Sequence, residues 1–182
     1  MARMIDQLLD FTRVRVGDGI PLAPKAVDLV PLVRQVIDEL DDARPEVPLQ
    51  LHSTGDTRGS WDADRLSQVF SNLVANAAQH GVPEHGCTVH IDGTEPDRLR
   101  VDVHNHGTIA ADVLPHIFEP MTGQRARDRS RGLGLGLFIT QQILEAHGGT
   151  IQVRSNAESG TTFTLVLLRT LPALAKPPSN PG

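Results

Sequence analysis

The chain has 182 residues, with 17 basic against 22 acidic residues, so its formal net charge at pH 7 is −5. This length suits one ordinary domain with short extensions, and a hydrophobic content of 39% allows a buried core and excludes global disorder. The acidic balance and the scarcity of aromatic residues argue against nucleic acid as the partner, because such surfaces are basic and stack bases on aromatic rings.

Cysteine content and hydropathy bear on the compartment. The single cysteine, Cys87, excludes a disulfide framework and is expected to pack in the core of a protein from the reducing cytoplasm. The uncharged, apolar stretch Gly132 to Leu144 is interrupted by three glycines and is too short for a membrane span. Acidic residues inside the apolar N-terminal segment argue against a signal peptide. We therefore expect a cytoplasmic protein in which this segment makes no membrane contact.

The first predicted element is an amphipathic helix at the N-terminus. Met1, Met4, Leu8 and Phe11 follow the 3-4-3 spacing of a coiled-coil seam. The pattern starts at residue 1 without a capping residue, as if a longer helix had been cut, and so short a helix has little stability alone. We expect residues 1–13 to form a dimer or bundle seam, with packing on the chain's own domain as the alternative.

The remaining pattern mixes strands and helices. Asp28 is expected to cap a helix that ends near Leu40, and Asp62 or Asp64 a long helix that ends near His80. Further helices are predicted around 112–118 and from about 134 to 147. Extended segments are predicted at 22–27, 47–52, 57–61, 87–92, 99–104, 150–154 and 161–169. The pattern predicts an α+β fold, a two-layer sandwich of a mostly antiparallel sheet with helices on one face. The proline-rich residues 171–182 predict a disordered tail.

Two asparagines stand one turn apart on the predicted long helix. Asn72 and Asn76 lie on the flank of its apolar stripe, where a helix can border a cleft. Amide groups can bind phosphate oxygens, and an amide oxygen can also bind a hard cation such as Mg²⁺. The alternative is that both residues only mark the polar face of the helix.

A glycine-rich run, 132–137, lies at a junction between a loop and a helix. Glycines let backbone N–H groups approach an anion there, and the helix N-terminus adds a favourable dipole. The run lacks the spacing of a dinucleotide fingerprint and the Gly-Lys-Ser/Thr of a P-loop. Four arginines and one aspartate precede it between 125 and 131. This loop is interpreted as a lid that grips phosphate, or alternatively as a solvated surface loop.

In this order, the elements resemble the catalytic, ATP-binding domain of sensor histidine kinases, in the superfamily shared with gyrase-type ATPases and heat-shock chaperones. Asp64 to Ala77 resembles the family's N box, Asn105-His106-Gly107 falls at the G1 box, Phe118 in the F box and 132–137 at the G2 box, and Gly160-Thr161-Thr162-Phe163 resembles the strand motif that borders the nucleotide. The resemblance implies a Bergerat-type ATP-binding fold over residues 21–170, preceded at residues 1–20 by the end of a second dimerisation helix.

The resemblance also implies the chemistry of the site. ATP and Mg²⁺ are the implied cofactors, with Asn76 as the Mg²⁺ ligand and Asn76 and Arg125 as the catalytic groups. The implied ATP-binding residues are Asn72, Asn76, Gln79, His80, Asn105, Gly107, Phe118, Arg131, Gly132, Leu133, Gly134, Leu135, Gly136, Leu137 and Thr162. The implied partners are a domain for dimerisation and phosphoacceptance, a response regulator, and a second copy of the chain through residues 1–13.

Several positions depart from the family pattern, among them Thr108-Ile109, which stand where the family often has a second glycine. Asn105 stands where the family usually has the Asp that accepts a hydrogen bond from the adenine amino group. Its amide oxygen can still accept, so we expect adenine selectivity with weaker affinity. Gln79 occupies a position that is commonly basic. His80 occupies a position that is often aromatic, which makes stacking on adenine plausible.

The phosphoacceptor motif of the family is absent from this sequence. None of the eight histidines is followed by an acidic residue with a proline four positions on. We therefore expect the acceptor histidine to come from outside this chain, which alone would bind ATP without phosphorylating itself. The alternatives are an anti-sigma-type ATP-binding regulator and a pseudokinase domain that has lost nucleotide binding. A metal pair formed by His104 and His106 is a weaker alternative, because no third ligand is evident.

Overall fold

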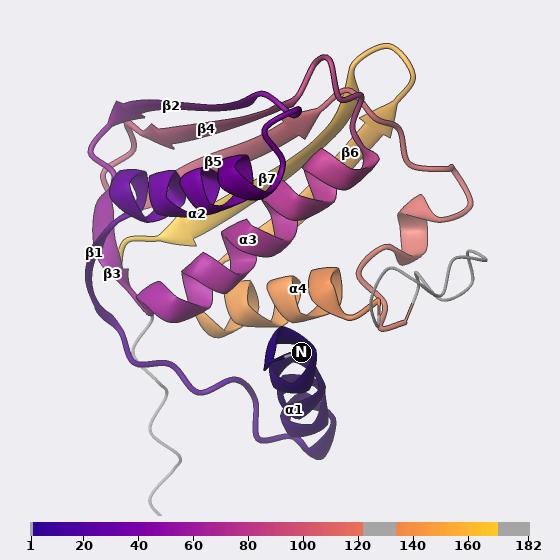
Figure 1. Cartoon of the computed structure of the whole chain (residues 1–182). Helices are drawn as coiled ribbons and strands as arrows, with labels where there is room; N and C mark the ends of the chain where they lie inside the picture. The colour runs from indigo at the N-terminus through magenta and orange to yellow at the C-terminus, as the bar shows by residue number, and fades with distance from the viewer. Residues whose placement is uncertain (1, 122–133, 171–182) are drawn as a thin grey trace, which may run out of the picture.

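A five-stranded mixed sheet carries helices on one face (Figure 1). The computed structural model describes residues 2–121 and 134–170, with side chains from residue 5 onward. The strand order is β2-β4-β5-β7-β6. β2 pairs in parallel with β4, whereas the other neighbours are antiparallel, which confirms the predicted mostly antiparallel sheet. The strands are β2 (Leu49–Gly55), β4 (Cys87–Gly93), β5 (Arg98–Asn105), β6 (Thr150–Asn156) and β7 (Gly160–Leu168).

The helices that cover the sheet are α2 (Leu29–Ala43), α3 (Ala63–His80) and α4 (Gly136–Ala146). The predicted cap at Asp28 is confirmed, because its side chain accepts a hydrogen bond from the Val30 backbone N–H. Of the two candidates for α3, Asp62 is the cap and accepts a hydrogen bond from the Arg65 backbone N–H. A small antiparallel pair, β1 (Lys25–Asp28) and β3 (Arg58–Trp61), lies beside the main sheet.

Prolines explain two differences from the predicted elements. The helix expected around 112–118 is only a 3₁₀ turn, η1 (Leu114–His116), because Pro115 has no N–H to continue the helical ladder. The strand expected from Val47 begins at Leu49, after Pro48. Residues 171–182, predicted to be a disordered tail, lie outside the described residues.

Alternation along the central strands builds the core. In β4, β5 and β7 every second side chain is buried against the helices, and α3 meets them with an apolar face. Cys87 is buried in β4, and burial raises the pKa of its thiol to about 12, as expected for a residue that packs in the core. The largest buried side chains include Phe70, Leu66, Leu73, Ile91, Leu99, Ile139, Ile143 and Phe163.

One end of the sheet is closed by long side chains that reach backbone atoms. Trp61 is 0% exposed, and its indole N–H donates to the Leu168 carbonyl at 2.7 Å. The Arg169 guanidinium donates to four carbonyl oxygens, those of Asp56, Arg58, Gly93 and Glu95. Side-chain donors therefore join β3, the end of β7 and the β4–β5 turn to one another.

A buried histidine completes this closed end. His147 Nε2 accepts a hydrogen bond from the Asp62 backbone N–H at 3.1 Å, and Nδ1 lies 2.8 Å from the Ile143 carbonyl, to which it donates. These partners require the neutral tautomer with the proton on Nδ1. Burial lowers the pKa of His147, which keeps the ring neutral at the junction of α3 and α4.

The N-terminal helix α1 (Ala2–Val16) docks on the domain by one side only. Phe11 meets Phe138 of α4 edge to face with ring centroids 5.7 Å apart, and Asp10 pairs with Arg65 of α3 at 2.7 Å. The side chains of this ion pair are 5% and 19% exposed. Ile5, Leu8 and Leu9 remain exposed on the helix. The helix thus packs on its own domain through Phe11 and leaves an apolar surface outside.

Residues 2–121 and 134–170 contain the four α-helices α1 to α4. None of these helices combines the length and the apolar character that crossing a membrane requires.

Candidate nucleotide site

The predicted N-box asparagines lie on α3 beside the start of α4. Asn72 Nδ2 donates to the Gly136 carbonyl at 3.3 Å and approaches Thr140 Oγ1 at 3.4 Å. Asn76 is half-buried one turn further along α3, on the same flank of the helix. The structure therefore brings Asn72 together with the glycine-rich N-terminus of α4, and places Asn76 one turn closer to the end of α3.

The predicted G1 residues stand where β5 ends, against the end of α3. Asn105 is 3% exposed at the last position of β5. A Cβ at Gly107 would lie 1.9 Å from the His80 carbonyl oxygen, so only glycine fits there. A Cβ at Gly160, whose φ is +76°, would lie 2.3 Å from the Asn105 carbonyl oxygen. The loop is thus pressed between α3 and the start of β7, with half-buried Gln79 next to its contact at His80.

The threonine beside this loop is not the one that the sequence interpretation chose. Thr162 shares a 2.9 Å contact with His104 and lies on the opposite sheet face from Asn105. The adjacent Thr161 is buried, pairs in register with Asn105, and donates to the Gly107 carbonyl at 2.8 Å. The alternation of side chains along the strand could have identified Thr161 from the sequence, because buried Phe163 shares its face of the sheet with residue 161 and not with residue 162.

Phe118 belongs to the wall of the core near this loop. Its ring packs edge to face on Phe163 with centroids 6.3 Å apart, two residues along β7 from Thr161. It is half-buried and packed against the core cluster. The predicted F-box residue is therefore held by apolar contact next to the strand that borders the loop.

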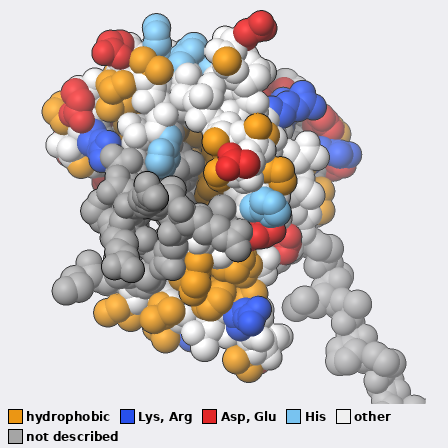
Figure 2. Space-filling view, turned by 90° about the vertical axis from the view of Figure 1, so that its right-hand side faces the viewer, with side chains coloured by type: hydrophobic (Ala, Val, Ile, Leu, Met, Phe, Trp, Pro, Cys, Tyr) orange, Lys and Arg blue, Asp and Glu red, His pale blue; other side chains and the backbone are white. Residues whose placement is uncertain are grey.

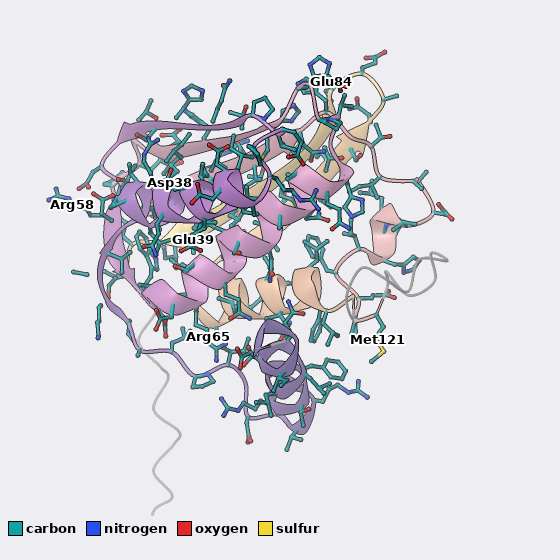
Figure 3. All side chains as sticks on the ribbon, in the orientation of Figure 1. Asp38, Glu39, Arg58, Arg65, Glu84 and Met121 are labelled. Atoms are coloured by element: carbon teal, nitrogen blue, oxygen red, sulfur yellow. The ribbon has the colours of Figure 1, made fainter. Side chains whose placement is uncertain are left out.

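The glycine run enters α4 through a left-handed residue. Gly134 has a φ of +67°, Leu135 is buried, and Gly136 begins the helix, with half-buried Leu137 after it. The Met121 N–H donates to the Gly134 carbonyl at 3.0 Å, which joins the two flanks of the intervening segment; Figure 3 labels Met121 at this place. The predicted residues Arg125, Arg131, Gly132 and Leu133 lie outside the described residues.

Three histidines gather beside the G1 loop. The His106 ring lies 4.7 Å from the His85 ring and 5.0 Å from the His104 ring, measured between centroids. Burial, with a smaller contribution from His106, lowers the pKa of His104. Among the residues that the structure describes, no group of three or more His, Cys, Asp or Glu side chains is arranged to hold a metal ion. The His104–His106 metal pair therefore gains no third ligand of this kind.

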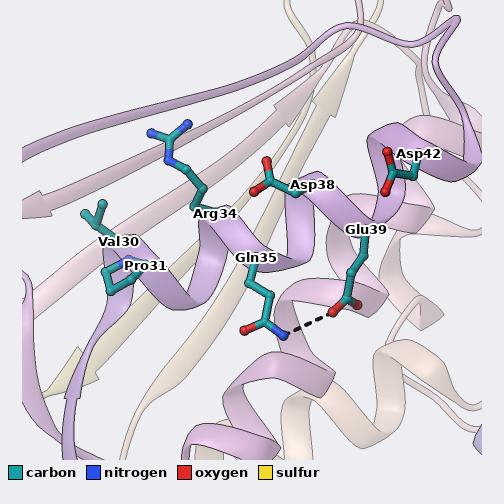
Figure 4. Close-up of a pocket in the computed structure, with 7 residues that line it drawn as sticks. All are labelled: Val30, Pro31, Arg34, Gln35, Asp38, Glu39 and Asp42. Atoms are coloured by element: carbon teal, nitrogen blue, oxygen red, sulfur yellow. Dashed lines mark hydrogen bonds between the residues drawn. The ribbon is translucent and has the colours of Figure 1, made fainter.

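Two hollows on the surface are lined by neither Asn72 nor Asn76. A shallow groove of about 490 Å³ lies on the outside of α2. Figure 4 shows its lining residues, among which Gln35 donates to Glu39 and Asp38 and Asp42 add acidic groups. A second hollow of about 520 Å³ lies between α1, α2 and α3 around the Asp10–Arg65 pair; Figure 3 labels Arg65 there. Neither hollow is lined by a residue that was predicted to bind ATP.

A family model and several known proteins match this chain. The model for the histidine kinase-, DNA gyrase B-, and HSP90-like ATPase matches residues 61–171, more than half of the chain. Sensor histidine kinase ZraS of Escherichia coli K12 is 36% identical over 170 residues, which are 91% of this chain and 34% of ZraS. The first four curated relatives are all much longer proteins, of which this chain spans between 21% and 44%.

Solved histidine kinase structures share the fold. Full-length ShkA in complex with AMPPNP is 25% identical with a TM-score of 0.75, and the match covers 92% of this chain and 35% of ShkA. ThkA in complex with the response regulator TrrA is 24% identical with a TM-score of 0.70, over 92% of this chain and 46% of that one, and at this identity shows the fold alone. The chain therefore belongs to the histidine kinase-, DNA gyrase B- and HSP90-like ATPase family, as an ATP-binding catalytic domain of the sensor histidine kinase type.

Proposed function

We propose that this domain binds Mg-ATP and transfers the γ-phosphoryl group to a histidine supplied by a dimerisation domain outside this chain. The observation that carries the proposal is the convergence of three elements: the asparagine flank of α3, the Asn105–Gly107 loop, and the glycine-rich start of α4. Glycines at Gly107 and Gly136 keep side chains away from the backbone at two of these places. Amide donors and a helix N-terminus suit a polyphosphate.

Each residue is assigned a role within this proposal. The Asn105 amide oxygen accepts a hydrogen bond from the adenine amino group, and the backbone N–H groups at Gly134 and Gly136 face phosphate oxygens. Asn72 lies on α3 and donates to the Gly136 carbonyl, which holds α3 against the start of α4. Asn76 would hold Mg²⁺, which neutralises charge on the transferring phosphoryl group when bound. Arg125 and Arg131 would stabilise charge on the same phosphoryl group. The remaining residues predicted to contact ATP are Gln79, His80, Gly107, Phe118, Gly132, Leu133, Leu135 and Leu137.

The proposed partners follow from α1 and from the relatives. We assign residues 1–20 to the end of a dimerisation helix, 21–170 to the catalytic domain and 171–182 to a tail. The exposed apolar side chains Ile5, Leu8 and Leu9 suit a second copy of the chain or the rest of a helical hairpin; Figure 2 shows hydrophobic side chains gathered at the lower part of the face where α1 lies. ThkA was solved with the response regulator TrrA, which supports such a partner for this chain. A cytoplasmic location belongs to the same proposal.

A nucleotide titration tests the binding step. The chain should bind a fluorescent ATP analogue in a Mg²⁺-dependent manner, and ADP should compete. Asn76→Ala should raise the Kd of Mg-ATP by about tenfold or more and remove most of the Mg²⁺ dependence. Gln142→Ala is the matched control, because Gln142 is an amide on α4 that bonds Glu145 and lies outside the site. A chain that binds no nucleotide at any Mg²⁺ concentration would be a pseudokinase domain instead.

Phosphotransfer tests the reaction. Incubation with ATP should leave no acid-labile phosphate on this chain alone, and should label a separately supplied dimerisation domain that carries an acceptor histidine. Label on this chain alone contradicts the proposal that the acceptor comes from elsewhere. Nucleotide binding together with phosphorylation of a serine in a partner protein would favour an anti-sigma-type regulator.

A further inference from the structure

Two hydroxyl groups on β6 and β7 hold the loop that follows Asn105. Thr161 Oγ1 donates to the Gly107 carbonyl oxygen at 2.8 Å, and the Ile109 backbone N–H donates to Ser155 Oγ at 2.8 Å. The two hydroxyl oxygens are themselves 2.8 Å apart. The loop is thus fastened at residue 107 and again at residue 109, from two adjacent strands.

The direction of each hydrogen bond follows from counting protons. A hydroxyl group has one proton to donate, and that of Thr161 goes to the Gly107 carbonyl. Ser155 must therefore be the donor in its contact with Thr161, while it accepts from Ile109. The chain runs from the Ile109 N–H through Ser155 and Thr161 to the Gly107 carbonyl. Such a chain polarises along its length, so loss of one member weakens the others.

The same loop has little room to move. The backbone at Gly107 lies against the His80 carbonyl at the end of α3, and Gly160 lies against the Asn105 carbonyl. Thr161, buried and in register with Asn105, supplies the floor. The hydroxyl chain and these close contacts together fix the backbone between Asn105 and Ile109.

We propose that Ser155 is a positioning residue for the nucleotide, acting through Thr161 and the Ile109 N–H to hold the Asn105–Ile109 loop in the conformation that accepts adenine. The inference rests on the proposed nucleotide-binding function. Ser155 lies on β6, outside every motif that the sequence resemblance identified, and acts only through other residues.

Three variants of the full chain separate the hydroxyl from the shape of the side chain. Ser155→Ala removes the acceptor of Ile109 and the donor to Thr161, and should raise the Kd of Mg-ATP about tenfold in calorimetric titration. Ser155→Thr keeps a hydroxyl on a strand and should remain within about twofold of the parent. Thr164→Ala is the matched control, because it deletes a β7 hydroxyl that bonds Asp102, away from the loop. It should also bind like the parent.

Hydrogen exchange gives a readout that needs no nucleotide. The Ile109 amide should be protected in the parent, Ser155→Thr and Thr164→Ala, and should exchange at least about tenfold faster in Ser155→Ala. Parent-like ATP affinity in Ser155→Ala overturns the inference, and so does an equal loss in Ser155→Thr. If the parent binds no nucleotide, the proposed function fails. Unchanged Ile109 exchange in Ser155→Ala would then also reject the role of the hydroxyl chain in holding the loop, whereas faster exchange would support that role.

Discussion

The two ends of the sheet are built in opposite ways. At the closed end, defined by Trp61, His147 and Arg169, large side chains donate to backbone carbonyls and fill the space between strands. At the other end, defined by Asn105, Gly107, Gly160 and Thr161, the backbone segments approach one another because side chains are missing or short. Both ends are tightly held, but only the second contains Asn105 and Gly107, the residues that we propose to contact the nucleotide.

This difference teaches where stability and function reside in the domain. α3 connects the two ends, because it starts beside Trp61 at the cap Asp62 and finishes at His80 against Gly107. Substitutions at the closed end should therefore lower the free energy of unfolding and leave affinity in the folded protein unchanged. Substitutions at the Asn105 end should change the affinity for nucleotide, whether or not they also lower the free energy of unfolding. Four substitutions, in order of decreasing effect, test this division.

Gly107→Ala should have the largest effect. Its Cβ would lie 1.9 Å from the His80 carbonyl oxygen, so the backbone of the loop must shift. We expect a loss of about 3 kcal/mol in the free energy of unfolding and no measurable ATP binding. Gly136→Ala is the comparison, because its Cβ would meet Asn72 at an ordinary 3.7 Å and the variant should fold like the parent. Parent-like ATP titration of Gly107→Ala would remove the distinction between the two ends.

Arg169→Met should destabilise without weakening binding. The variant loses donors to four carbonyl oxygens, and we expect the free energy of unfolding, measured with urea, to decrease by about 2 to 3 kcal/mol. The ATP affinity of the folded variant should equal that of the parent. Arg154→Met, an exposed arginine on β6, is the control and should stay within about 0.5 kcal/mol. Weaker ATP binding by folded Arg169→Met would show that the closed end contributes to the site.

His147→Leu should act through pH as well as through packing. The leucine leaves the Asp62 N–H without its acceptor, which costs about 2 kcal/mol at neutral pH. Because the pKa of His147 is lowered in the folded state, the unfolded chain binds the proton more tightly, and parent stability should fall as pH drops below 6.5, the ordinary pKa of histidine.

The pH dependence needs its own control, because the pKa of His104 is lowered too. Urea unfolding at pH 7.5 and pH 5.5 should show that His147→Leu loses part of the decrease seen in the parent, and that His104→Gln loses a separate part. A parent chain whose stability rises on acidification would contradict the sign of both shifts.

Asn105→Asp should have the smallest effect. A carboxylate accepts a hydrogen bond about twice as strongly as an amide, so we expect the Kd of ATP to fall about fivefold. In the parent, ATP should bind more tightly than GTP, because the amide oxygen of Asn105 still accepts from the adenine amino group. GTP binding as tight as ATP binding in the parent would contradict this role for Asn105.

Local patterns were sufficient for most of the fold. The caps at Asp28 and Asp62, the apolar face of α3 and the alternation in β4 and β5 all follow from neighbouring residues, and all were predicted from the sequence. The parallel pairing of β2 with β4 was not predicted, because strand pairing depends on residues far apart in the chain. Pro115 reduced a predicted helix to a 3₁₀ turn.

The candidate site was predictable in part for the same reason. Asn72, Asn105 and Gly107 were marked by motifs, and the structure places each beside a neighbouring element. Thr161 was passed over for Thr162, because sheet register decides which of two adjacent threonines faces the loop. Ser155 had no motif at all, since its role depends on distances between two hydroxyls and a backbone N–H. Such contacts are properties of the folded chain and leave no local pattern.

Trp61 has a practical consequence for the laboratory. It is the only tryptophan, the chain has no tyrosine, and the indole is fully buried with its N–H bonded to Leu168. Near-ultraviolet fluorescence therefore reports a single site at the closed end. The emission of the native protein should be blue-shifted, and aqueous quenchers should not reach the indole. Nucleotide binding at the opposite end should leave the emission unchanged. Unfolding and ligand binding can thus be followed in one cuvette with signals that do not interfere.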